Sequence, residues 1–155
     1  MPVRYLCQKI MKKISCIALL VFNSAFSLAQ KPIVFSTSEG ALRGYDPVAY
    51  FTDAKPTKGT SEFTFNYQGA VWHFASDESL KIFKSDPEKF MPQFGGYCAF
   101  GMSRGYKADT EPAAWTILDG KLYMNYNLAV RTEWSKKQLE YIEKANKNWP
   151  AIREK

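Results

Sequence analysis

Histidine and cysteine are scarce in this sequence, and the common catalytic motifs are missing. The 155 residues contain one histidine, His73, and three cysteines, Cys7, Cys16 and Cys98. There is no Gly-x-Ser-x-Gly turn, no Walker phosphate loop, no dinucleotide-binding fingerprint and no His-Glu-x-x-His zinc motif. We therefore expect a protein that is not an enzyme. So few thiols and imidazoles also argue against a structural zinc site, which usually takes four such ligands.

The sequence also lacks a hydrophobic run long enough to span a membrane. Its most apolar stretch, residues 14–22, is far shorter than the ~20 residues that a spanning helix needs. This stretch follows the basic pair Lys12-Lys13 and precedes Ser27-Leu28-Ala29, which places small residues before a cleavage point. That order is typical of a secretory signal peptide. We therefore predict a signal peptide over residues 1–29, cleaved after Ala29, and a periplasmic or secreted protein.

Removal of the predicted leader changes both the charge and the cysteine content. The leader contains four basic residues and no acid, so its loss lowers the formal charge from +6 to +2. Such a small charge gives no basis for nucleic-acid binding. Cys7 and Cys16 leave with the leader, and Cys98 then has no intramolecular partner. An odd thiol in an exported protein is either buried and inert, or it is reactive, metal-binding or paired with another molecule.

The first predicted element is a β-hairpin over residues 62–75. Phe63, Phe65 and Tyr67 alternate with polar residues, as in a half-buried strand, and Gln68-Gly69 supplies the turn. The returning strand places Trp72 and Phe74 on its core face and His73 on the opposite face. Short helices are then predicted over residues 78–84, capped by Ser76 or Asp77, and after Asp86, which precedes a proline at the first helical position.

A second hairpin is predicted around Asp119-Gly120, and a long helix follows it. Asp-Gly between apolar runs is a strong hairpin signal because both turn positions need a positive φ. The helix is predicted from its cap Asn127 to about Trp149, ended by Pro150, with ion pairs Glu133/Lys137, Glu140/Lys144 and Glu143/Lys147 on its polar face. The predicted fold class is α+β: small antiparallel hairpins packed with short helices and a long C-terminal helix. We expect a flexible arm at 30–40, one domain at 41–150 and a tail at 151–155.

Cys98 is the strongest candidate site residue. It lies in the stretch 95–102 (GGYCAFGM), four residues before Met102. A thiolate, a thioether and the imidazole of His73 together suit a soft metal such as Cu(I). One hypothesis is therefore a metal-binding module for a copper ion, with Cys98 as principal ligand and Met102 and His73 auxiliary. The alternatives are a structural or protein-interaction domain with Cys98 buried and no metal, and a thiol redox protein, which lacks a nearby resolving cysteine.

Several segments of the chain resemble the YHS domain family. They are 45–51 (YDPVAYF), 67–76 (YQGAVWHFAS), Phe83 with 86–90 (DPEKF), 95–99 (GGYCA), 114–117 (AWTI) and 119–123 (DGKLY). The last three resemble the longer, exported bacterial members, so the resemblance covers nearly all of the mature chain. It implies a non-catalytic α+β domain, and it does not imply a particular activity.

The resemblance also suggests where a metal would bind in related domains. Shorter relatives accompany proteins that handle copper and heavy metals, and a cysteine-rich form is thought to bind metal. Its cysteines follow Asp-Pro-Val and form Cys-Ser-x-x-Cys after the hairpin. This chain has Ala49, Ala75 and Ser79 at those three positions. The metal site of those relatives therefore does not carry over, and Cys98 is a different position.

Overall fold

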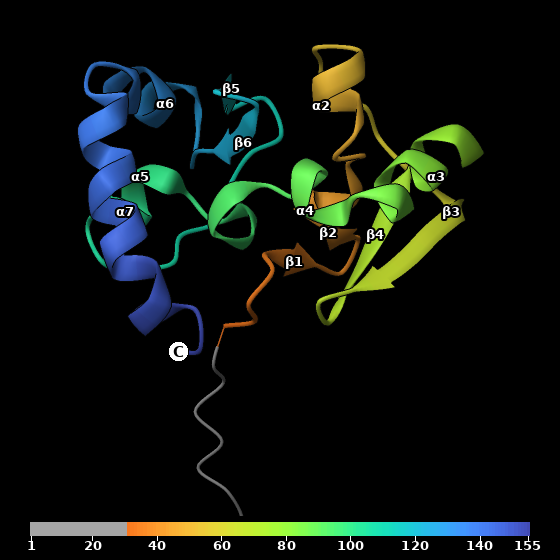
Figure 1. The fold of residues 1–155 in the computed structure, drawn as a ribbon, viewed down its shortest axis with the longest axis horizontal. Coiled ribbons are helices and arrows are strands. Elements are labelled where there is room, and N and C mark those ends of the chain that lie inside the picture. Colours follow the sequence, from red (N-terminus) through yellow and green to blue (C-terminus); the bar gives the residue numbers. More distant parts are fainter. Residues whose placement is uncertain (1–30) are drawn as a thin grey trace, which may run out of the picture. The chain divides into compact units, whose positions relative to one another are not determined.

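The computed structural model describes residues Lys31–Lys155, and the predicted signal peptide lies outside this range. Within it, three two-stranded antiparallel sheets alternate with helices (Figure 1), which confirms the predicted α+β class. The first part of the chain forms β1 (Ser36–Thr37), β2 (Gly40–Ala41), η1 (Leu42–Gly44), α2 (Ala49–Thr52), β3 (Thr60–Tyr67), β4 (Ala70–Phe74), α3 (Asp77–Ser85) and α4 (Pro87–Phe90). The second forms η2 (Gln93–Gly96), α5 (Ala99–Ser103), β5 (Trp115–Leu118), β6 (Lys121–Met124), α6 (Leu128–Ser135) and α7 (Gln138–Ile152).

The hairpin of β3 and β4 follows the alternation of its sequence. Its turn is at Gln68-Gly69, where both residues have positive φ. Trp72 and Phe74 are fully buried, whereas Val71 on the other face is 42% exposed. The predicted core face is therefore confirmed. The register shifts between Thr60 and Thr64, which marks a β-bulge near the start of β3.

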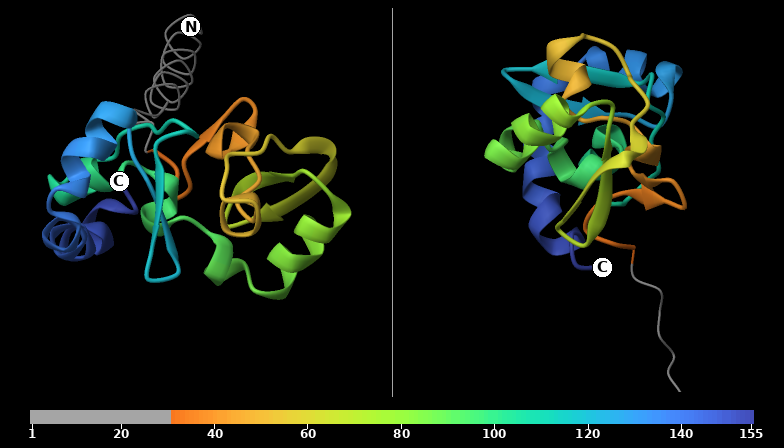
Figure 2. Two further views of the ribbon diagram at one scale, coloured as in Figure 1. Left: turned by 90° about the horizontal axis from the view of Figure 1, so that it is seen from above. Right: turned by 90° about the vertical axis from the view of Figure 1, so that its right-hand side faces the viewer.

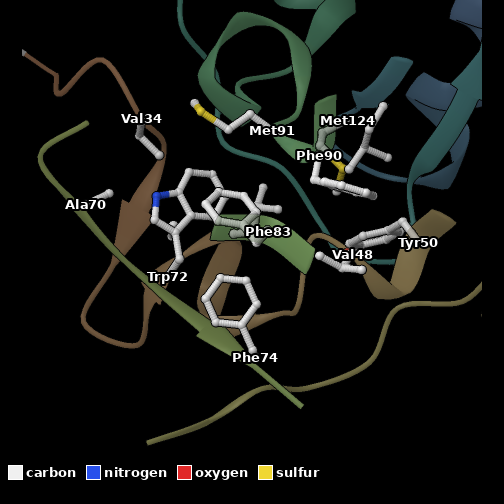
Figure 3. Packing of buried hydrophobic residues seen from close by; sticks show 13 residues of the cluster. Val34, Val48, Tyr50, Ala70, Trp72, Phe74, Phe83, Phe90, Met91 and Met124 are labelled. Atoms are coloured by element: carbon white, nitrogen blue, oxygen red, sulfur yellow. The ribbon is translucent and has the colours of Figure 1, made fainter. Parts of the chain in front are cut away.

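A first hydrophobic cluster fills the space between this hairpin and the helices that follow it. Phe83 of α3 is fully buried, and its ring lies 5.3 Å from that of Trp72 and 5.2 Å from that of Phe74. Figure 3 shows Phe83 between these two side chains, with Phe90 and Met124 farther along the cluster. The caps that start the helices are those predicted: Ser76 Oγ accepts from Ser79 N–H, and Asp86 Oδ1 accepts from Lys89 N–H.

A second hydrophobic cluster lies under α5, α6 and α7. Its buried residues include Tyr97, Met102, Trp134 and Ala145. The hairpin of β5 and β6 turns at Asp119-Gly120, with φ of 50° and 69°, as the Asp-Gly signal predicted. In the views of Figures 1 and 2, the β3–β4 hairpin lies at one end of the described residues and α7 at the other. We call the residues up to Phe90 the first region and those from Gln93 onward the second region. The clusters cross this division, since Met124 of β6 packs in the first cluster and Phe35 in the second.

The predicted C-terminal helix is interrupted, which corrects the prediction. Asn127 caps α6 as expected, since its Oδ1 accepts from Val130 N–H at 2.9 Å. The helix ends at Ser135 and restarts at Gln138. Trp134 and Ala145 are both fully buried in the second cluster. A straight helix would separate their backbones by about 16 Å along its axis, and the break allows both side chains to enter one cluster.

The break also changes the ion pairs and the position of Pro150. Glu140–Lys144 and Glu143–Lys147 form as predicted, at 2.7 Å and 2.6 Å. Glu133 pairs with Lys136 and not with Lys137, because helical backbone angles continue through the C-cap Lys136 but not through Lys137, which instead pairs with Glu140. Pro150 lies inside α7, which continues to Ile152. Proline has no backbone N–H group, so α7 lacks one hydrogen-bond donor in its last turn.

The N-terminal segment differs from the flexible arm that we expected at 30–40. Val34 and Phe35 are buried, at 1% and 4% exposure, and β1 pairs with β2. The hydroxyl of Tyr97 donates to the carbonyl of Pro32 at 2.7 Å. Burial of two apolar side chains in a mostly polar segment fixes the chain here. No helix among the described residues is long and apolar enough to cross a membrane.

Candidate functional site

The glycines that precede Cys98 are required by backbone packing. Gly95 has a φ of 63°, which favours glycine. Its carbonyl accepts from Phe35 N–H at 2.8 Å. A Cβ at this position would collide with the carbonyl oxygen of Ile33. Gly95 therefore allows the N-terminal segment to pack closely against the start of the second region, and this role needs no ligand.

Cys98 is the N-cap residue of α5, and its sulfur makes polar contacts on two sides. Sγ accepts from Gly101 N–H at 3.4 Å. The thiol donates to Oδ1 of Asn125, 3.7 Å away. Only 2% of the residue is exposed. Burial raises the pKa of the Cys98 thiol, and the backbone N–H groups around the sulfur oppose that shift only in part. The thiol is therefore protonated at neutral pH.

Met102 lies one turn after Cys98, but its side chain packs in the second cluster. It is fully buried there with Tyr97, Trp134 and Ala145. Its backbone N–H donates to the carbonyl of Cys98 at 2.8 Å, as expected for adjacent helical turns. The thioether thus contributes to the hydrophobic core next to the thiol.

His73 lies on β4, in the other region of the molecule. Its Nδ1 is 3.0 Å from the carbonyl oxygen of Thr60, so the ring proton belongs on Nδ1. Gly40 packs so closely on the ring that a Cβ there would lie 2.7 Å from Cδ2 of His73, and a Cβ at Gly59 would lie 2.7 Å from Cβ of His73. Figure 1 shows β4 and α5 on opposite sides of the described residues. The three predicted ligands are therefore not brought together.

Cys98 does line a cavity, which we call the Cys98 groove. It has a volume of about 400 Å³ and mostly apolar walls. The lining residues come from α5, from the loop after it and from the start of α6: Cys98, Phe100, Gly101, Arg104, Tyr106, Ala108, Tyr126 and Val130. Tyr106 and Tyr126 are each 52% exposed. The groove thus combines aromatic walls, a protonated thiol and a single cation.

Asn125 is a buried polar residue that the sequence analysis missed. Its side chain is fully buried, and its Oδ1 accepts from Cys98 and, at 3.4 Å, from Phe100 N–H. Nδ2 has no hydrogen-bond partner among the described residues. The sequence signal was only an asparagine within the run 121–126 that follows the Asp119-Gly120 turn, and asparagine is depleted in strands. Through these two hydrogen bonds, Asn125 holds the Cys98 thiol and the first turn of α5 in place.

A second cavity lies in the first region, and we call it the alanine cavity. Its volume is about 380 Å³. Ala49, Ala75 and Ser79, which occupy the cysteine positions of the cysteine-rich relatives, all line it. The other lining residues are Asp46, Thr52, Asp53, Ser76, Glu78 and Ile82. The fold thus brings the three positions to one cavity, but none of them has a sulfur donor, so a thiolate metal site does not fit these residues.

Asp46 forms part of the alanine cavity and holds its walls together. It is fully buried, its Oδ1 accepts from Val48 N–H at 2.8 Å and its Oδ2 accepts from Ala75 N–H at 2.9 Å. These bonds join the start of α2 to the end of β4. Across the described residues, no three His, Cys, Asp or Glu side chains gather so that they could hold a metal ion. The carboxylate therefore has a structural role that accounts for both of its oxygens.

The fold is a small α+β domain in which the alanine cavity has mixed polar and apolar walls and the Cys98 groove has mostly apolar walls. Comparison with known families identifies the first region: residues 48–94 match the sequence model of the YHS domain. The chain is therefore a YHS domain-containing protein, as the motifs predicted. No curated protein and no solved structure matches the chain significantly. The match includes the alanine positions and ends before Cys98, so the Cys98 groove belongs to the part of the chain that follows the matched domain.

Proposed function

We propose that this chain is an exported, non-catalytic binding domain and that its ligand site is the Cys98 groove. The observation that supports this proposal is the groove itself. Its volume of about 400 Å³ lies in the usual range for small-molecule sites. Its walls are mainly aromatic and aliphatic, and such walls bind apolar groups by removing their surface from water. The ligand would therefore be a small molecule with an apolar ring or chain.

The non-catalytic part of the proposal is supported by the state of the thiol. A catalytic cysteine needs a lowered pKa and a neighbouring base, whereas burial raises the pKa of Cys98. The side chain that contacts the sulfur is the neutral amide of Asn125. A protonated thiol with these contacts serves as an apolar wall of the groove and as the cap of α5.

The exported part of the proposal is supported only by the sequence of residues 1–29. Its charged, apolar and small-residue order is that of a signal peptide. Expression of the full chain in a bacterium, followed by cell fractionation and mass spectrometry, tests it. We expect an exported protein that begins at Gln30. An unprocessed chain retained in the cytoplasm would contradict export without affecting the proposal about the groove.

Soft-metal binding is the second candidate function, and the position of Cys98 on the groove wall is the observation that favours it. Cu(I) prefers two or more sulfur or imidazole donors. In the groove it would find one thiol, because Met102 is in the core and His73 is on β4. Competition with a Cu(I) chelator tests this candidate in wild type, Cys98→Ser and His73→Gln. Copper affinity that is lost only in Cys98→Ser would favour it over an organic ligand.

A neutral fluorescent naphthylamine, N-phenyl-1-naphthylamine, tests the main proposal. We expect saturable binding of one probe per chain, with increased fluorescence as the probe leaves water. Val130→Trp places a large side chain on the groove wall and should weaken binding at least about tenfold, because it fills the space that the probe needs. Leu139→Trp is the matched control, since Leu139 is 72% exposed on α7 and does not line the groove.

The two tryptophan variants make the outcome decisive. Loss of binding in Val130→Trp with retention in Leu139→Trp supports the groove as the site. Equal binding in both variants would assign the probe to another surface. Absence of binding to the wild-type protein would overturn the proposal for apolar small molecules. Far-ultraviolet circular dichroism establishes that both variants remain folded.

A further inference from the structure

Arg104 differs from every other arginine in the described part of the chain. The four arginines there are Arg43, Arg104, Arg131 and Arg153. Three of them have polar partners: Arg43 bonds to the carbonyl of Thr110, Arg131 to the hydroxyl of Thr116 and Arg153 to Glu154. The guanidinium of Arg104 has neither an ion pair nor a hydrogen bond within Lys31–Lys155. Its five donors are therefore available to a ligand.

Arg104 lies at the groove, so a ligand bound there is within reach of its donors. Arg104 is the C-cap residue of α5 and lines the Cys98 groove. Its Cζ atom lies 4.4 Å from the centre of the Phe100 ring, which is a cation–π contact. Phe100 lines the same groove, so the ring supports the guanidinium at the edge of an apolar surface. Stacking of this kind leaves the edge of the guanidinium, where its N–H groups are, free to bind.

No acidic side chain balances this cation. The lining of the groove contains no Asp or Glu. Of the acids nearby in sequence, Asp109 contacts Lys31 and Arg43, and Glu133 contacts Lys136. Glu111 forms no ion pair among the described residues, and it does not line the groove. A single positive charge therefore stands beside an apolar cavity. That arrangement is complementary to a ligand with an apolar body and one negative end.

We propose that the ligand of the Cys98 groove is a small amphipathic carboxylic acid. This inference rests on the proposed function. The apolar ring of the ligand packs among the aromatic residues Phe100, Tyr106 and Tyr126. Its carboxylate accepts two parallel hydrogen bonds from the Arg104 guanidinium, a geometry that suits arginine and not lysine. The aromatic walls favour an aromatic acid, because rings pack well edge to face against other rings.

Two probes of the same shape test this inference: 2-naphthoate, which is anionic, and 2-naphthamide, which is neutral. Each displaces the neutral naphthylamine in a competition titration. We expect the wild-type protein to bind 2-naphthoate about tenfold more tightly than 2-naphthamide, as a charge-assisted pair allows. Arg104→Gln should abolish this preference, so that the two probes bind the variant with equal affinity. Arg104→Lys should restore only part of it.

Arg131→Gln is the matched control, because Arg131 lies on α6 outside the groove lining. It should preserve the tenfold preference. Equal affinities of the two probes in the wild type, or a preference that survives Arg104→Gln, would overturn the inference and leave the groove as a site for neutral molecules. Failure of both naphthalene probes and of the naphthylamine to bind the wild type would instead overturn the proposed function. The preference should also weaken as salt is added, because the pair is at the surface.

Discussion

The alanine cavity and the Cys98 groove have similar volumes, about 380 and 400 Å³, but opposite chemistry. The alanine cavity lies within the matched YHS domain or directly beside it, and it is lined mainly by acids and hydroxyls. The groove lies after the matched residues, and most of its lining is aromatic or aliphatic, including the rings of Phe100, Tyr106 and Tyr126. The only described cysteine is in the groove, and the three positions that are cysteines in related domains are in the cavity.

The residues that match the YHS family and the residues that form the proposed ligand site are therefore different parts of the chain. Membership is carried by the hairpin, the caps and the core around Phe83, none of which requires a ligand. The cavity that brings Ala49, Ala75 and Ser79 together is retained without sulfur donors. The features that could recognise a ligand, an apolar cavity and an unpaired arginine, are in the second region. A metal site assigned from the family alone would fall in the alanine cavity, whereas the site that we propose is the Cys98 groove.

The largest expected change is a gain in metal affinity when thiols are placed in the alanine cavity. The variant Ala49→Cys/Ala75→Cys/Ser79→Cys should bind Cd²⁺ at least about a thousandfold more tightly than the wild type, because three thiolates would face one cavity. Ultraviolet absorption from thiolate-to-cadmium charge transfer measures the binding.

The control Ala49→Ser/Ala75→Ser places hydroxyls at two of these positions and should not gain affinity for Cd²⁺, because hydroxyls are hard donors. A folded three-cysteine variant with no more affinity than this control would show that the three positions do not converge closely enough to share an ion. The cavity would then have lost its geometry as well as its ligands.

The second prediction compares the buried polar residues of the two cavities. Asp46→Ala leaves the buried N–H group of Val48 and the half-buried N–H group of Ala75 without an acceptor. It should lower the free energy of unfolding by about 2–4 kcal/mol. Asn125→Ala removes a side chain of similar size whose contacts, at 3.4 and 3.7 Å, are longer. It should cost about 1 kcal/mol.

Urea denaturation of both variants gives the two free energies, with Asp46→Asn as an intermediate case that keeps one acceptor. The order Asp46→Ala above Asn125→Ala is the expected result. The reverse order would mean that Asn125 stabilises its region more than its long contacts indicate, for example through a water bound to Nδ2.

The smallest expected change is the contribution of the Cys98 thiol to the pH dependence of the free energy of unfolding. Because burial raises the pKa of Cys98 in the folded protein above its unfolded value, the protonated thiol contributes stability that is complete below the unfolded pKa of about 8.5. That contribution is lost as the pH rises through the folded pKa. Cys98→Ala should therefore lose less stability than the wild type between neutral and alkaline pH, with a difference of about 1 kcal/mol or less.

Urea denaturation at pH 7 and at alkaline pH measures this difference. Tyr97, whose pKa burial raises to about 12, contributes an alkaline loss that both proteins share. Alkylation of native Cys98 by iodoacetamide should also be slower than that of the unfolded chain. A native rate as fast as the unfolded rate would contradict a buried, protonated thiol and would reopen the redox alternative.

Local features of this protein were predictable because they depend on neighbours in the chain. The alternation around Trp72 and Phe74 predicted which face is buried, and Asp119-Gly120 predicted a turn with positive φ. The caps at Ser76, Asp86 and Asn127 were also correct. Each of these features follows from side-chain periodicity or from a hydrogen bond within three residues.

The errors share a different physical origin. The break after Ser135 and the packing of Val34 and Phe35 both result from contacts with distant segments. The amphipathic pattern of residues 127–149 is continuous, so it contains no signal for the break. Tertiary packing overrides local helix propensity where a break in a helix, or the packing of a chain terminus, buries more apolar surface than the locally preferred conformation would.

The α+β class, the two hairpins, the helix caps, the YHS resemblance and the candidacy of Cys98 all follow from the sequence alone. That Met102 and His73 lie apart from Cys98, and that Arg104, Phe100 and Tyr126 line one groove with it, depends on the tertiary structure. The reason is physical. Periodicity and caps act within a few residues, whereas a cavity forms where side chains from separate elements fail to fill the space between them, and that depends on how the whole chain packs.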